Sequence, residues 1–170
     1  MNYSSHDIAD ILKRLDHTDI GSSEEAISTS LLRSCLEQIP DLSQTLLAGI
    51  VADSWRSGGH HHGDLVGRRS DQVAVHVEIK GPRSYVNRSK SSCKRTNCLG
   101  PGLLQFEHML EDGVPVILLT SPDAGSLRWL ARHTPDLLQR LRVMHWAEAA
   151  GAIRSLPPVH FDPLKSMLGV

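Results

Sequence analysis

The sequence predicts an α/β domain in which a mixed β-sheet is flanked by helices. Its 170 residues suffice for one ordinary domain with a core and are too few for two. Residues 73–80 alternate aliphatic and polar side chains, as in a half-buried strand, whereas 114–120 form an apolar run typical of a strand buried on both faces. In the segments before and between these strands, apolar residues recur at the spacing of a helix. We therefore expect a single domain spanning 1–170, with N-terminal helices in 1–40, a core in 41–146, and a helix and tail in 147–170.

Three helices are predicted before the first strand. Apolar residues recur at helical spacing from about residue 5 to residue 15. A serine pair at 22–23, followed by two glutamates, can cap a second helix that ends before Pro40. Asp41 can cap a third helix, whose broad apolar stripe continues to the neighbourhood of Trp55.

Two strand-like runs follow, at 63–66 and 73–80, with 68–71 as their connection. The short connection favours antiparallel pairing. An extended strand at 73–80 directs its aliphatic side chains to one face and its polar side chains to the other. Glu78 and Lys80 then share a face, and Asp64 from the first run can approach it.

The second half of the chain alternates helices and strands. Residues 81–102 lack periodicity and predict a long loop, a kind of segment that is usually functional or disordered. The elements expected after it are a helix from 103 to about 112, a buried strand at 114–120, helices at 126–132 and 135–141, a strand at 142–146 and a last helix at 147–155.

Asp64, followed fourteen positions later by Glu78-Ile79-Lys80 and then by a helix and an apolar strand, resembles the PD-(D/E)XK nuclease superfamily. This superfamily includes restriction endonucleases and many repair and defence nucleases. The resemblance covers roughly 41–146, and its specific part is three residues and the element order. It implies a restriction-endonuclease-like fold in which Asp64 and Glu78 bind Mg²⁺, for which Mn²⁺ can substitute. It also implies that the Ile79 carbonyl is a further ligand and that Lys80 positions or activates water.

The chain departs from the family pattern at several positions. Gly63 stands where a proline usually precedes the first aspartate, and Gln105 lies on the following helix, as in several branches, but Met109 replaces the tyrosine expected one turn later. Gln105 is thus expected beside the catalytic residues. Members also often use an acid from an upstream helix, and the sequence leaves four candidates open: Glu24, Glu25, Glu37 and Asp53.

The expected function is metal-dependent hydrolysis of phosphodiester bonds, with DNA as the favoured substrate. Carboxylate-bound Mg²⁺ can neutralise the charge that gathers on the phosphate and lower the pKa of a bound water. Restriction, repair or defence would be natural roles. The alternative is a catalytically inactive nuclease-like domain that binds nucleic acid or a partner protein. Whether the substrate is DNA or RNA, how many strands it has, and whether cutting is internal or terminal are left open.

The loop that follows Lys80 is rich in lysine and arginine and contains no acidic residue among them. Either a solvated loop or a phosphate-contacting segment fits it, since Lys and Arg contacts dominate nucleic-acid affinity. Net charge is only −1, so binding requires such a local patch. A homodimer, or a partner protein that supplies specificity, is left open. The candidate nucleic-acid-binding residues are Arg83, Arg88, Lys90, Lys94 and Arg95.

Three consecutive histidines at 60–62 and the cysteines Cys93 and Cys98 form a weak zinc candidate. A polar loop leading into the Asp64 strand is the favoured interpretation, because three consecutive residues of a regular element cannot all face one ion. The odd number of cysteines indicates reduced thiols. With no membrane-spanning run or leader pattern in the sequence, we expect a cytoplasmic location.

Overall fold

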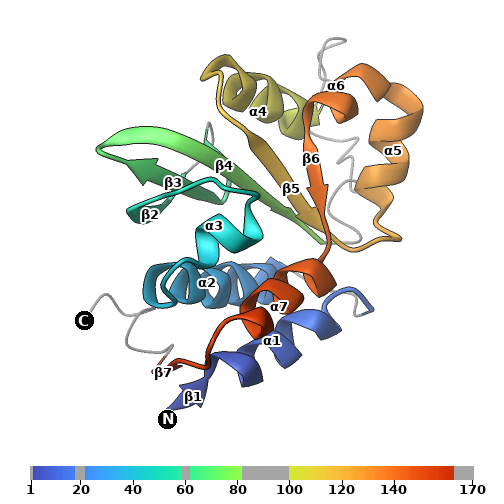
Figure 1. The fold of residues 1–170 in the computed structure, drawn as a ribbon. Coiled ribbons are helices and arrows are strands. Elements are labelled where there is room, and N and C mark those ends of the chain that lie inside the picture. Colours follow the sequence, from blue (N-terminus) through green and yellow to red (C-terminus); the bar gives the residue numbers. More distant parts are fainter. Residues whose placement is uncertain (1, 18–21, 59–61, 82–99, 163–170) are drawn as a thin grey trace.

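The computed structural model describes residues 2–17, 22–58, 62–81 and 100–162. They form a five-stranded mixed sheet with helices on both faces (Figure 1), which confirms the predicted α/β class. In spatial order, the strands are β2 (Ser54–Ser57), β3 (Leu65–Arg69), β4 (Gln72–Lys80), β5 (Val116–Thr120) and β6 (Arg142–Met144). A separate two-stranded sheet pairs β1 (Tyr3–Ser4) with β7 (His160–Phe161).

The sheet combines an antiparallel half with a parallel half. Strands β2, β3 and β4 are antiparallel, whereas β4, β5 and β6 are parallel. The predicted antiparallel pairing of β3 with β4 is confirmed, but the predicted four-residue connection is wrong. Only Ser70 and Asp71 form the turn, with φ of 49° and 64°, and Arg68 and Arg69 belong to β3. Two left-handed residues make a tight hairpin whose twist matches that of the strands, so the strands extend up to the turn.

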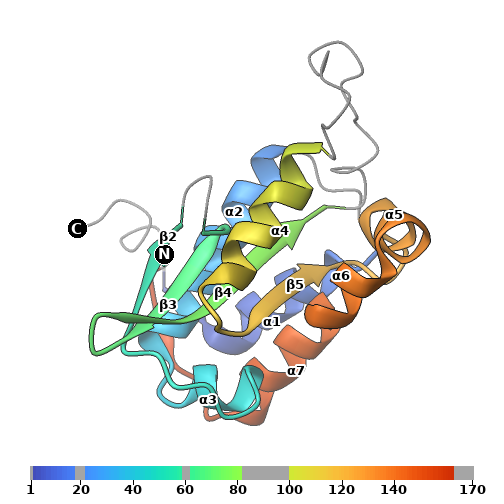
Figure 2. The ribbon, with the colours of Figure 1, turned by 90° about the horizontal axis from the view of Figure 1, so that it is seen from above.

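Helices cover the two faces unequally. Helices α1 (Ser5–Arg14), α2 (Ser22–Gln38), α3 (Leu42–Leu46) and α7 (Trp146–Ser155) lie on one face (Figure 1). The other face carries α4 (Gly100–Glu111), α5 (Gly125–His133) and α6 (Pro135–Arg140), and Figure 2 shows α4 crossing over β4. Each face therefore has its own apolar core.

The alternation in β4 assigns its side chains to these two faces, as the sequence predicts. Val75, Val77 and Ile79 are buried in the larger core, together with residues of α1, α2 and α7. Between them, His76 and Glu78 are also buried, at 0% and 1% exposure, on the face covered by α4. Two polar side chains of a central strand therefore lie inside the protein, where each requires a polar partner.

The predicted third helix is wrong in its length. Helix α3 ends at Leu46, and Ala48 and Gly49 then adopt left-handed backbone conformations (φ 52° and 89°) that cannot continue a helix. Trp55 belongs to β2 instead, where it pairs with Gly67 of β3 and is buried. The apolar stripe predicted as one helix is therefore a short helix, a turn and a strand that the helical pattern does not indicate.

The remaining predicted elements occur with small shifts. The predicted strand at 142–146 is two residues too long, because His145 is the N-cap of α7 and Trp146 its first residue. Residues 82–99 of the predicted loop lie outside the described residues, and α4 begins at Gly100. Within the described part of the chain, none of the helices combines the length and apolar character needed to cross a membrane.

Candidate metal-binding active site

Asp64, the residue just before β3, lies next to Glu78 of β4. Leu65 pairs with Val77 in the β3–β4 register, so the residues just beyond that pair, Asp64 and Glu78, come side by side. The Asp64 Oδ2 atom accepts a hydrogen bond of 2.7 Å from the backbone N–H of Ile79. This bond attaches the Asp64 carboxylate to β4 and leaves Oδ1 as a potential metal ligand.

Glu78 is held by two side chains. Its Oε2 atom accepts a hydrogen bond of 2.9 Å from Gln105 Nε2 on α4, and its Oε1 atom forms an ion pair with the Lys80 ammonium. These partners offset the cost of burying a carboxylate. Gln105 thus lies beside the predicted catalytic residues, as expected.

Burial raises the pKa of Glu78 to about 7. The nearby Lys80 ammonium opposes this shift, whereas the carboxylates of Asp64 and Glu25 add to it. A group with such a pKa exchanges its proton near neutral pH. A divalent cation at this position would favour the ionised carboxylate.

Lys80 is the cation of the cluster, and its side chain is 16% exposed. Burial favours the neutral amine, but the carboxylates of Glu78, Asp64 and Glu25 outweigh burial and raise the pKa of Lys80. The backbone carbonyl of Lys80 accepts a hydrogen bond of 2.5 Å from the Thr120 hydroxyl of β5, which anchors the end of β4. Lys80 is therefore a charged ammonium at a fixed place.

Glu25 of α2 is the upstream acid that the described geometry brings to this cluster. Its Oε2 atom accepts a hydrogen bond of 3.2 Å from the backbone N–H of Gly81, the residue after Lys80. Burial raises the pKa of Glu25, the Lys80 charge opposes the shift, and the Asp64 charge adds to it. Three carboxylates thus influence one ammonium electrostatically, and together the four groups carry an excess of negative charge.

Two of the other upstream candidates, Glu37 and Asp53, have partners away from this cluster. Glu37 pairs with Arg33 on the same helix, at 2.7 Å. Asp53 accepts a hydrogen bond from the backbone N–H of Ser70, at the hairpin turn and therefore at the opposite end of β4 from Lys80. The side chain of Glu24 lies outside the described residues.

The departure from the family pattern at Gly63 has a physical cause. Its φ of +79° excludes proline, which fixes φ near −65°, and favours glycine. A Cβ at this position would lie 2.9 Å from the Met109 Sδ atom and 2.9 Å from the Val77 carbonyl oxygen. Met109 is fully buried there, so the residue in place of the expected tyrosine packs against the backbone that carries Asp64.

The donor set fits a hard divalent cation. Mg²⁺ and Mn²⁺ prefer oxygen ligands, and the neighbouring residues Asp64 and Glu78 supply carboxylate oxygens. The excess negative charge is a further reason for a cation to bind here. Ligation by the Ile79 carbonyl stays a prediction.

Several sequence predictions fall outside the described residues. These include the whole basic segment, Arg83, Arg88, Lys90, Lys94 and Arg95, and the zinc candidates His60, His61, Cys93 and Cys98. The third histidine of the run, His62, is described, and it lies beside His76 and Asp112. No sequence pattern indicates this second polar cluster. His76 stands at a polar position of β4, but nothing in the sequence signals that Asp112, thirty-six residues later, meets it.

Comparison of the chain with protein-family models, with curated proteins and with solved structures finds no match in any of the three. The relation to the PD-(D/E)XK superfamily therefore remains a resemblance in residues and element order.

Proposed function

We propose that this protein is a Mg²⁺-dependent nuclease of the PD-(D/E)XK type that hydrolyses phosphodiester bonds, with DNA as the substrate. One observation carries the proposal: at one end of β4, Glu78 pairs with Lys80, Asp64 bonds to the Ile79 N–H and Glu25 bonds to the Gly81 N–H. The element order around them, with three antiparallel strands, a helix and a parallel strand, also supports it. The roles in restriction, repair or defence are extended from the family by analogy.

The proposed chemistry divides between the cation and the protein. When bound by Asp64 and Glu78, Mg²⁺ would neutralise phosphate charge and lower the pKa of a coordinated water. Lys80 would orient the attacking water and contribute positive charge to the transition state. Gln105 would keep the Glu78 carboxylate in position through its amide hydrogen bond. Glu25 would add negative charge beside the cation and fix the end of β4 through Gly81.

The substrate would be held by positive charge outside this pocket. The basic segment that contains Arg83 and Arg95 follows the catalytic strand directly and supplies the cations that phosphate contacts require. A homodimer or a partner protein would supply specificity, because phosphate contacts alone carry no sequence information.

A cleavage assay tests the proposal. Supercoiled plasmid and labelled oligonucleotides, of DNA and RNA and in single- and double-stranded form, are incubated with the protein and Mg²⁺, Mn²⁺ or a chelator. We expect metal-dependent cutting that Asp64→Ala and Lys80→Ala each reduce by at least about 100-fold. Lys13→Ala, which removes an exposed lysine of α1, is the matched control and should cut normally. Nucleic-acid binding without cutting, unchanged by the chelator, would instead support the inactive binding domain.

A further inference from the structure

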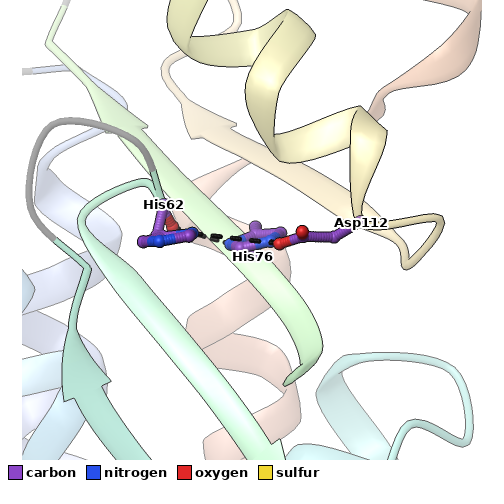
Figure 3. A group of neighbouring side chains, drawn as sticks. All are labelled: His62, His76 and Asp112. Atoms are coloured by element: carbon purple, nitrogen blue, oxygen red, sulfur yellow. Dashed lines mark hydrogen bonds and ion pairs between the residues drawn. The ribbon is translucent and has the colours of Figure 1, made fainter. Parts of the chain in front are cut away.

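His62, His76 and Asp112 come together from three separate parts of the fold (Figure 3). His62 lies just before Gly63 on the segment that enters β3, His76 is in the middle of β4, and Asp112 directly follows α4. The His62 and His76 rings stack with centroids 5.7 Å apart and an angle of 8° between their planes. Imidazole nitrogens and a carboxylate oxygen are typical ligands of Zn²⁺.

The two hydrogen-bond contacts of His76 leave room for a metal ion between this residue and Asp112. The His76 Nδ1 atom is 2.7 Å from the His62 carbonyl oxygen, which can only accept, so Nδ1 carries a hydrogen and donates it. The Nε2 atom is 2.7 Å from the Asp112 Oδ2 atom. In a neutral ring with hydrogen on Nδ1, the Nε2 lone pair would face a carboxylate oxygen that is also an acceptor. A second proton or a metal ion bound by both atoms would resolve this conflict.

We propose that His62, His76 and Asp112 bind Zn²⁺ or a similar divalent transition metal. Besides the His76 contact, Asp112 Oδ2 is 3.8 Å from His62 Nδ1, and the three potential ligand atoms all lie within 4.8 Å of one another. Tetrahedral Zn²⁺ with bonds of about 2.0–2.1 Å separates its ligand atoms by about 3.3 Å. The distances of 2.7 Å and 3.8 Å fall on either side of this spacing, so small side-chain movements suffice to bind the ion.

The surroundings of the cluster support a metal site in two further ways. A histidine that binds a metal usually donates its other N–H to a carbonyl or carboxylate, as His76 does to the His62 carbonyl. The side chains of His62 and Asp112 are 51% and 37% exposed, so an ion can enter from solvent and a water can complete the coordination. His76 forms the buried floor of the site.

This site is separate from the carboxylate site and does not depend on the proposed nuclease activity. Its nitrogen ligands favour Zn²⁺, whereas the oxygen ligands around Lys80 favour Mg²⁺. His62 and Asp64 flank Gly63, so a metal on His62 would tie the segment that carries Asp64 to the end of α4. The ion would thus stabilise the place of Asp64 without touching a substrate.

Binding of Zn²⁺ alone to the metal-stripped protein tests the proposal. Calorimetric titration of the intact chain should show one tight site, and Co²⁺ should give the visible absorption of a tetrahedral nitrogen and oxygen site. His62→Ala and Asp112→Asn should each weaken Zn²⁺ binding at least about tenfold, since even indirect partners of metal ligands contribute this much. Both replaced side chains are exposed. His17→Ala and Asp123→Asn, at exposed positions outside the cluster, are the matched controls and should bind normally.

Two further measurements make the result decisive. Replacing both His60 and His61 by alanine should leave the affinity unchanged, which separates this site from one built on the histidine run. Far-ultraviolet circular dichroism of each variant establishes that it is folded. The proposal is overturned if the wild-type chain binds no Zn²⁺, if His62→Ala and Asp112→Asn bind as well as wild type, or if only the His60/His61 double variant loses binding.

Discussion

Two polar clusters share one face of β4, two residues apart along the strand, and they differ in chemistry. The cluster at Glu78 combines the Glu78–Lys80 ion pair with the carboxylates of Asp64 and Glu25, whereas the cluster at His76 has two imidazoles and one carboxylate. Glu78 and His76, the β4 residues of the two clusters, are both almost completely buried. The same strand alternation thus produces one site suited to a hard cation and one suited to a transition metal. The difference arises from what α2, α4, the segment before β3 and the residue after α4 bring to each position.

The largest expected effect is a loss of cleavage activity that leaves Zn²⁺ binding at the other cluster unchanged. Glu78→Gln keeps the shape of the side chain but removes the charge that would bind Mg²⁺, so we expect cleavage to fall at least about 100-fold. Zn²⁺ affinity at His62 should change little in the same variant. Cleavage rates and Zn²⁺ titrations on one preparation measure both. Equal loss of both properties would mean that the clusters form one functional unit.

The next effect concerns the backbone between the clusters. Gly63→Ala should destabilise the protein by about 1–3 kcal/mol from backbone strain alone, with a further cost from the contacts to Met109 and the Val77 carbonyl. Gly113→Ala is the matched control, because it also has positive φ, +68°, but no atom within 4 Å of the added Cβ. Urea denaturation measures the two free energies of unfolding. An equal loss in both variants would contradict the close packing described at Gly63.

The pH dependence should distinguish the apo protein from the metal-bound one. Because the pKa of Glu78 rises from 4.5 to about 7, its contribution to apo stability is present in full below pH 4.5 and is lost as pH rises through about 7. Mn²⁺ binding should follow the opposite course, since the cation displaces the proton, and weaken about tenfold for each pH unit below 7. Titrations with Mn²⁺ from pH 5.5 to pH 8 measure this slope, which Glu78→Gln should abolish. A flat profile in wild type would show that Glu78 is already ionised throughout.

The smallest expected effect is at Gln105, which contacts the carboxylate site without supplying charge. Gln105→Ala removes one hydrogen bond to a charged or partly charged group, so we expect a loss of about 1.5–3 kcal/mol at most in transition-state stabilisation, smaller than for Glu78→Gln. Gln105→Glu should be worse than Gln105→Ala because it adds a fourth carboxylate. Steady-state cleavage with Mg²⁺ measures both. If Gln105→Ala were as damaging as Glu78→Gln, Gln105 would have a direct catalytic role.

The sequence predicts the carboxylate site better than the helices before it. Strand alternation places Glu78 and Lys80 on one face, and the tight hairpin brings Asp64 beside them, so local patterns are enough. Whether Glu25 or Glu37 joins the site depends on where α2 passes the end of β4. The contact between Glu25 and Gly81 joins residues fifty-six positions apart, and no local sequence pattern encodes it. No local pattern encodes the contact between His76 and Asp112 either.

The errors in the fold have local causes. The apolar residues from Leu46 to Trp55 fit a helical stripe, but left-handed Ala48 and Gly49 end α3, and pairing with β3 converts the segment around Trp55 into β2. Tertiary pairing overrides the helical pattern here. Strands of two residues, such as β1 and β7, are too short to carry any alternation that a sequence could reveal.

A crystal structure with Mn²⁺, located by its anomalous scattering, tests the central claim most directly. We expect a Mn²⁺ ion bound by Asp64 and Glu78, with the Lys80 ammonium beside it. Crystals saturated with Mn²⁺ near pH 8 that show no ion at these carboxylates, or that show the two carboxylates directed apart, would contradict it.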